Sequence, residues 1–93
     1  SDRQQLVGEL QDISDRWITI DVKNKFHTGD LMELVTPSGN VTFGLEEMRN
    51  KDNQPVAVAP GSGHVVRIPV PDEVDNNSVD EFAMLVRYLP RDA

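Results

Sequence analysis

The feature that most constrains the fold is a series of short runs in which apolar and polar residues alternate. The clearest run is WITIDV, residues 17–22, where Ile18, Ile20 and Val22 would share one face. Alternation with a period of two is the pattern of a half-buried β-strand. Further runs occupy residues 5–13, 31–36, 41–45, 56–59 and 64–70. Their number and spacing predict a small all-β domain.

Turn-forming residues between these runs indicate antiparallel hairpins. The break at residues 14–16 is short enough for a tight turn between the first two runs. The sequence Pro37-Ser38-Gly39-Asn40 has the proline and glycine placement of a second tight turn. Before residue 31, Gly29 and Asp30 predict a turn in which the glycine has a positive φ and the Asp30 carboxylate accepts a backbone hydrogen bond.

The run at residues 5–13 alternates less regularly than the run at residues 17–22. Strict alternation over residues 5–13 would place Leu6, Gly8 and Leu10 on one face of the strand and Val7 on the opposite face.

The segment 78–89 fits either a helix or a strand. Ser78 and Glu81 have the spacing of a helix-capping box, whereas FAMLVRYL also fits a strand buried on most of both faces. Because six strands precede it, a closing strand completes the pattern, and we favour that interpretation. The predicted architecture is a small, closed or nearly closed β-barrel of about six to seven strands.

The chain length and apolar content predict one small domain spanning residues 1–93. No run approaches the roughly 18 apolar residues of a membrane span, so we expect a cytoplasmic protein without a membrane partner. The chain contains no cysteine, which excludes disulfides and thiolate metal sites. Because it begins with Ser1 instead of Met, we expect it to be part of a longer protein.

Charge limits the partners of this domain. Nine basic and sixteen acidic residues give a net charge of −7, which disfavours bulk binding of nucleic acid. Five of the acids fall within residues 72–81, a segment that is either a solvated loop or a docking surface for a basic partner. By contrast, Lys23 and Lys25 have no acid between Asp21 and Asp30.

The sequence shows no catalytic or metal-binding constellation. His27 and His64 are the only histidines and lack the spacing of a metal site. Ser62 lies near His64, but no third group is available locally to orient the histidine as a base. We therefore expect no metal, no cofactor and no catalytic residue within this chain.

The stretch Lys23-Asn24-Lys25-Phe26 is the candidate contact site. Two lysines with an interleaved amide and an aromatic ring could meet phosphates and stack on a base. The alternative is that Phe26 is a core residue below a barrel corner and that both lysines are solvated. The residues leave both interpretations open.

The order of motifs resembles the C-terminal domain of the U32 peptidase family. The stretches that carry the resemblance are VKNKFHTGDLMELVTPSGN, EEMRNKDNQPVAVAPGSGHVV and MLVRYL, and it runs from about Val7 to Leu89. More loosely, the Gly-Asp turn and PGSGHVV are similar to the barrel of translation-factor domain II, which is an analogy of fold.

The resemblance implies a C-terminal module that follows a larger catalytic domain. Family members are called peptidases or collagenase-like proteases, and some are linked to hydroxylation of bases in tRNA or rRNA. The residues that define the reactive domain of the family are not in this chain, so no catalytic role transfers to it.

Two functions remain open for such a module. In the first, residues 23–26 help to bind substrate RNA for the upstream active site. In the second, the domain packs on the catalytic domain or another protein through Phe26 or Met48, and in a true protease it could position the peptide. An autonomous peptidase is disfavoured.

Overall fold

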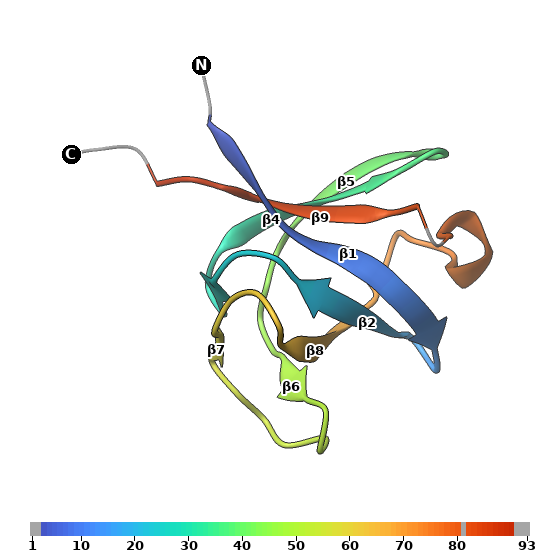
Figure 1. The fold of residues 1–93 in the computed structure, drawn as a ribbon. Coiled ribbons are helices and arrows are strands. Elements are labelled where there is room, and N and C mark those ends of the chain that lie inside the picture. The colour runs from blue at the N-terminus through green and yellow to red at the C-terminus, as the bar shows by residue number, and fades with distance from the viewer. Residues whose placement is uncertain (1–2, 81, 91–93) are drawn as a thin grey trace.

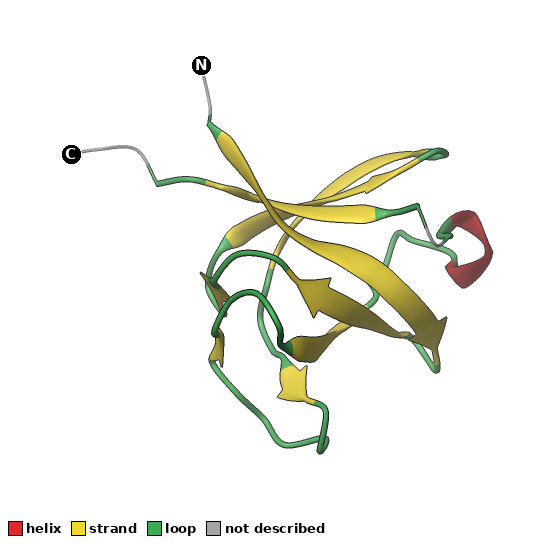
Figure 2. Ribbon diagram, viewed as in Figure 1, coloured by secondary structure: helices red, strands yellow, loops and turns green. Residues whose placement is uncertain are grey.

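The computed structural model describes residues 3–80 and 82–90 (Figure 1). These residues form nine β-strands in two sheets, so the predicted all-β fold is confirmed. The strands are β1 (Gln4–Ser14), β2 (Trp17–Val22), β3 (Phe26–His27), β4 (Leu31–Thr36), β5 (Gly39–Gly44), β6 (Arg49–Asn50), β7 (Val58–Ala59), β8 (Val65–Pro69) and β9 (Met84–Tyr88). A short 3-10 turn, η1, covers Asn76–Ser78 (Figure 2). Within the described part of the chain, no helix is long and apolar enough to cross a membrane.

Seven strands form one antiparallel sheet in the order β5-β4-β9-β1-β2-β8-β6, and β3 pairs with β7. The large sheet is strongly curled (Figure 1). The buried side chains of the described residues form one core cluster. The sheet differs from a closed barrel because, in residues 3–80 and 82–90, no ladder joins the outer strands β5 and β6. Strand β6 has only two residues, and Leu45 and Met48 of the preceding connection are buried. Buried apolar side chains of this connection therefore cover the core where the outer strands do not pair.

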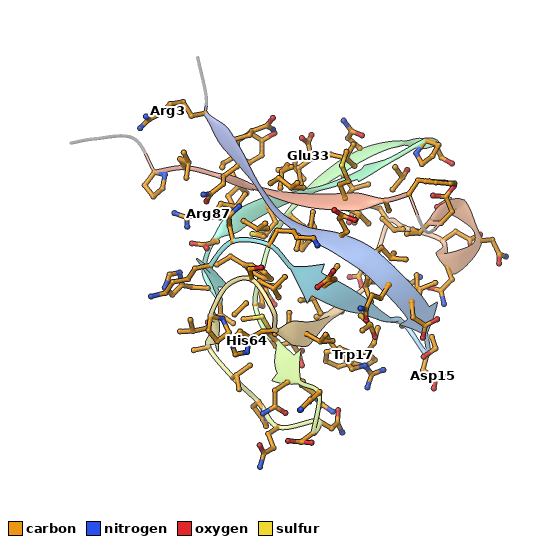
Figure 3. The ribbon with its side chains drawn as sticks, viewed as in Figure 1. Arg3, Asp15, Trp17, Glu33, His64 and Arg87 are labelled. Atoms are coloured by element: carbon orange, nitrogen blue, oxygen red, sulfur yellow. The ribbon has the colours of Figure 1, made fainter. Side chains whose placement is uncertain are left out.

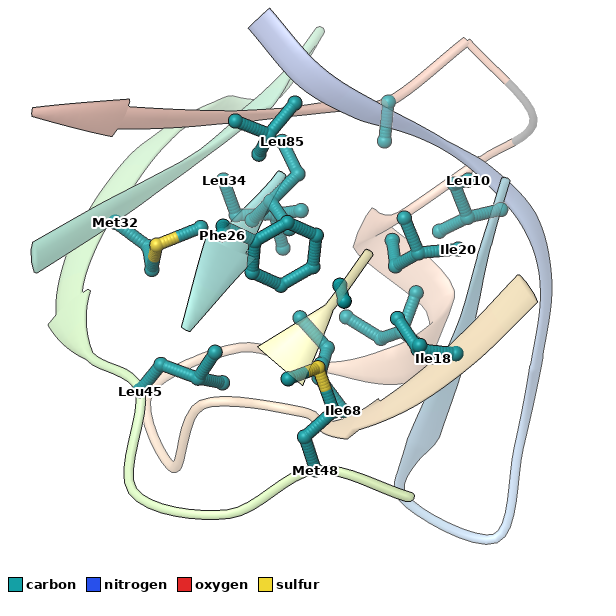
Figure 4. Packing of buried hydrophobic residues seen from close by; sticks show 14 of the residues in the cluster. Leu10, Ile18, Ile20, Phe26, Met32, Leu34, Leu45, Met48, Ile68 and Leu85 are labelled. Atoms are coloured by element: carbon teal, nitrogen blue, oxygen red, sulfur yellow. The ribbon is translucent and has the colours of Figure 1, made fainter. Parts of the chain in front are cut away.

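The core is built from the inward-facing side chains of the curled sheet (Figure 4). Strand β2 alternates as predicted, with Ile18, Ile20 and Val22 fully buried. Phe26 of β3 lies among the buried side chains and is itself 0% exposed. Burial of apolar surface of this kind is the main stabilising contribution to a small domain.

The β1–β2 hairpin turns in two residues, Asp15 and Arg16, with φ of +52° and +62°. Positive φ at both central positions is the geometry of a type I′ turn, whose twist matches that of the flanking strands. The guanidinium of Arg16 also donates to the Pro71 carbonyl and to Asn76 Oδ1, both at 3.0 Å. The predicted tight turn is thus confirmed, and it anchors the loop that leads to β9.

Two bulges in β1 change which of its residues face the core. The register shifts between Leu6 and Gly8 against β9, and between Leu10 and Asp12 against β2. Each bulge inserts an extra residue and bends the strand. Val7 is consequently buried together with Gly8 and Leu10, while Leu6 is exposed. The strict alternation predicted for this strand is therefore wrong at Leu6 and Val7.

Gly8 permits a close approach of β1 to β2 at the first bulge. A Cβ at this position would overlap with Cγ2 of Ile20 and lie 3.1 Å from the Asp21 carbonyl oxygen. We expect Gly8→Ala to lower the free energy of unfolding by about 2 kcal/mol, as at other overpacked sites. Gly44→Ala is the matched control, because a Cβ there meets nothing within 4 Å, and we expect no destabilisation. Equal urea midpoints for the two variants would contradict this close approach.

Most of the segment 78–89 forms strand β9 and its flanking turns, which supports the strand interpretation over the helix. Strand β9 occupies the middle of the sheet, paired with β1 on one side and β4 on the other. Ser78 ends the 3-10 turn η1, and Glu81, the second residue of the alternative capping box, lies outside the described residues.

Candidate nucleic-acid interface

Residues 23–25 connect β2 to β3 and are fixed to β1 by hydrogen bonds. The backbone N–H of Lys23 donates to the Val7 carbonyl at 2.7 Å, and the side-chain amide of Asn24 donates to the Leu6 carbonyl at 2.8 Å. These bonds continue the contact between β1 and β2 past Val22, the last residue of β2. Asn24 thus has a structural role at this corner.

The two lysines of this corner have different surroundings. Lys23 Nζ lies 3.0 Å from Asp21 Oδ2. This hydrogen bond, followed by the negative charges of Asp21 and Glu9, holds the pKa of Lys23 above its ordinary value of 10.5. Lys25 is exposed, and it takes part in none of the ion pairs formed by the described residues. Of the two, Lys25 is better placed to meet an external anion.

Phe26 is fully buried, which corrects its place among the candidate contact residues. Its backbone pairs with Ala59 of β7, and its ring packs in the core, with no exposed face for a base to stack on. The same correction applies to Met48, which is 1% exposed and cannot contact another domain. The core interpretation of Phe26 is therefore the one that the structure supports.

The carboxylate of Asp30 organises the other side of this corner. Gly29 has a φ of +93°, and Asp30 Oδ2 accepts a hydrogen bond from the backbone N–H of His27 at 2.8 Å, as predicted for this turn. The same oxygen lies 3.7 Å from His27 Nδ1 and 3.8 Å from Nε of Arg87. Nε of Arg87 is buried without a hydrogen-bonding partner among the described residues, so Asp30 supplies its nearby negative charge.

A second surface, the Trp17 face, consists of Trp17 of β2, Arg49 of β6 and Arg67 of β8. Figure 3 labels Trp17. Cζ of Arg49 lies 4.7 Å from the centroid of the Trp17 ring, and Cζ of Arg67 lies 5.7 Å from it. Both distances are within the range of a cation–π interaction. The register explains the cluster, because Arg67 pairs with Thr19 of β2 and with Arg49 of β6.

The two arginines of the Trp17 face form no ion pair with a described carboxylate. None of the ion pairs formed by residues 3–80 and 82–90 involves Arg49 or Arg67. Nη1 of Arg49 donates to Asn53 Oδ1 at 3.2 Å, which holds the side chain in place without neutralising it. Planar guanidinium groups and aromatic rings are the groups on which unpaired RNA bases stack, and arginine also binds phosphate. The Trp17 face can therefore supply both kinds of contact.

Sequence reasoning did not identify the Trp17 face. A signal was present for Trp17 itself, because it alternates in phase with Thr19 and Asp21, the polar face of β2. No local signal placed Arg49 and Arg67 beside it, since their proximity comes from the pairing of β8 with both β2 and β6.

An acidic groove of about 430 Å³ lies near the open side of the sheet. Its lining includes the apolar residues Phe43, Leu45 and Val70, and the carboxylates Glu46, Glu47, Asp72 and Glu73. The carboxylates are exposed, as are Asp75 and Asp80 farther along the loop. This exposure agrees with a solvated loop.

The described residues bring together no catalytic set. Ser62 and His64 are both exposed, and no hydrogen bond joins their side chains in this part of the chain. Within residues 3–80 and 82–90, no group of three or more His, Cys, Asp or Glu side chains could hold a metal ion.

Fold and sequence define a class: a small, curled, antiparallel β-domain. The model of the peptidase family U32 C-terminal domain matches residues 2–85. This chain therefore belongs to the peptidase U32 C-terminal domain family, as the sequence resemblance indicated.

Two curated relatives are each called tRNA hydroxylation protein P. The protein of Escherichia coli K12 is 43% identical over 88 residues, covering 94% of this chain and 18% of the relative. That of Haemophilus influenzae is 42% identical over 91 residues, covering 96% of this chain and 19% of the relative. The chain thus spans about a fifth of the length of these relatives.

A solved structure confirms the fold. The C-terminal domain of a protein assigned to the U32 peptidases in Geobacillus thermoleovorans superposes with a TM-score of 0.75 at 19% identity. The match covers 91% of this chain and 92% of the solved one. At this identity the similarity concerns the fold alone.

Proposed function

We propose that this chain is a non-catalytic C-terminal module that helps a longer, cytoplasmic protein to bind a substrate tRNA. The observation that carries this proposal is the Trp17 face, where two arginines stack on an indole outside the core. The names of the relatives, tRNA hydroxylation protein P, support the substrate class. The chemistry itself would take place in the preceding part of that protein.

The overall charge of the domain restricts where RNA could bind. With a net charge of −7, most of the surface repels phosphate groups, and contact is favoured only where basic side chains gather. Arg49 and Arg67 form one such place, and the corner lysines Lys23 and Lys25 lie just beyond the other end of β2. In this proposal a base lies at Trp17 and phosphates lie near Arg49 and Arg67.

The proposal predicts that RNA binding depends on Arg49 and Arg67. We expect the double variant Arg49→Glu/Arg67→Glu to weaken binding of unmodified tRNA at least about tenfold, as expected for loss of a stacking contact and two cationic contacts. Trp17 is the only tryptophan, so quenching of its fluorescence reports binding at the proposed site. The measurement is a fluorescence titration of the 93-residue chain at about 50 mM and about 200 mM salt, where electrostatic binding differs strongly.

Two controls separate a specific effect at Arg49 and Arg67 from a general effect of charge, and the effect of charge from that of the planar guanidinium groups. Arg3→Glu makes the same substitution at an exposed position just before β1, and we expect it to reduce affinity less than Arg49→Glu alone or Arg67→Glu alone. Arg49→Lys/Arg67→Lys retains charge but removes the planar groups, so we expect an intermediate affinity. Absence of quenching at low salt, or an equal effect of Arg3→Glu, would overturn the assignment of RNA to this face.

A further inference from the structure

The outward face of β9 is apolar, although this strand lies in the middle of the sheet. Met84, Val86 and Tyr88 point away from the core, while Leu85 between them is fully buried. Met84 is 40% exposed, and Phe82, two residues earlier, is 73% exposed. An antiparallel sheet with one solvated face normally carries polar residues at such positions, as β2 does at Thr19.

The neighbouring strands extend this apolar surface. Leu6 of β1 lies opposite Val86, and Val35 of β4 lies opposite Met84. Together Leu6, Val35, Met84 and Val86 form a contiguous patch across three strands, which we call the β9 face. Contiguous apolar patches on the surface of a domain mark places where another protein surface binds.

The carboxylates beside the β9 face favour a protein over RNA as its partner. Glu9 lies opposite Met84 and Glu33 lies opposite Val86, so two carboxylates flank the patch. Glu33 is held by a hydrogen bond from the Gln4 amide at 2.9 Å. Because carboxylates repel phosphate groups, RNA is disfavoured here, and the patch fits an apolar protein surface with basic residues around it.

We propose that the β9 face packs against the part of the parent protein that precedes this domain. About four fifths of the length of each curated relative lies outside the region that matches this chain. Strand β1 begins at this face, since Gln4 pairs with Tyr88 and the Leu89 N–H donates to the Arg3 carbonyl at 2.9 Å. A chain entering β1 therefore arrives beside the patch, and the covalent link raises the effective concentration of the preceding part there.

The test uses cysteine accessibility, because the 93 residues contain no native cysteine. Met84→Cys places a thiol in the centre of the β9 face, and Ser62→Cys places one in the exposed turn before β8 as a matched control. Maleimide labelling at each position is measured by peptide mass spectrometry in the 93-residue chain and in the full-length parent protein. We expect labelling at position 84 to be at least tenfold slower in the parent, and labelling at position 62 to differ by less than twofold.

The other outcomes would each overturn this proposal. Equal labelling at position 84 in both proteins would show that the β9 face remains open in the parent. Slow labelling in the 93-residue chain that becomes slower with increasing protein concentration would assign the face to a second copy of the domain. Equal protection of positions 62 and 84 in the parent would place the contact elsewhere. None of these results depends on RNA, so the outcome is independent of the Trp17 face.

Discussion

Replacing Phe26 with alanine is expected to lower the free energy of unfolding by about 3 to 5 kcal/mol, the range found for large buried aromatic residues. The ring is 0% exposed and contributes to the single core of the domain. Small domains have a total stability of about 5 to 15 kcal/mol, so this variant would be partly unfolded at 37 °C or close to it. Urea denaturation followed by circular dichroism measures the change.

Phe82→Ala is the matched control for this substitution. It removes the same side chain from a position that is 73% exposed, and we expect a change below about 0.5 kcal/mol. Phe26→Leu retains most of the apolar volume and should cost less than about 1.5 kcal/mol. If Phe26→Ala and Phe82→Ala had similar midpoints, the assignment of Phe26 to the core would be wrong.

Asp30→Ala is expected to lower the free energy of unfolding by about 3 kcal/mol. The substitution removes a charge-assisted hydrogen bond, and it leaves the half-buried Arg87 without its nearest carboxylate. The carboxylate accepts the His27 N–H at 2.8 Å and lies 3.8 Å from Nε of Arg87. Since about a fifth of each side chain remains exposed, solvent reduces the loss below that of a fully buried pair. Urea denaturation gives the change in free energy.

Two further variants test the mechanism at Asp30. Asp30→Asn retains an oxygen that can accept the His27 N–H but removes the charge, so we expect a smaller loss than for alanine. In an Arg87→Met background, Asp30→Ala should cost less than in the wild type, because the interaction with Arg87 is already absent. Equal costs in the two backgrounds would show that Asp30 acts through the turn alone.

Much of the sheet could be predicted because its strands depend on local patterns. Strand β2 alternates without interruption, and the short break at residues 14–16 is followed directly by its first residue. The bulge at Leu6 could not be predicted, because it arises from the way β1 pairs with β9 and with β2 at the same time. The gap between β5 and β6 has a similar cause, since no local pattern reports whether two distant edges meet.

The candidate site was predicted less well than the fold. Residues 23–26 attracted attention through composition, yet the structure uses Asn24 for a backbone carbonyl and Phe26 for the core. Burial of an aromatic residue next to lysines is a property of the folded corner, and the sequence allowed both orientations. The Trp17 face is produced by pairing of three strands, so its arginines meet only after the sheet has formed.

The place of β9 has a consequence for folding kinetics. The last strand of the described chain lies between β1 and β4, so the ladder joining the two halves of the sheet cannot form until this segment is available. Contacts between residues so distant in sequence close large loops, which slows the approach to the transition state. Until β9 inserts, β1 and β4 each expose an unpaired edge that could pair with another molecule. Intermediates without β9 would therefore be the aggregation-prone species, and a chain truncated before Met84 would remain in that state.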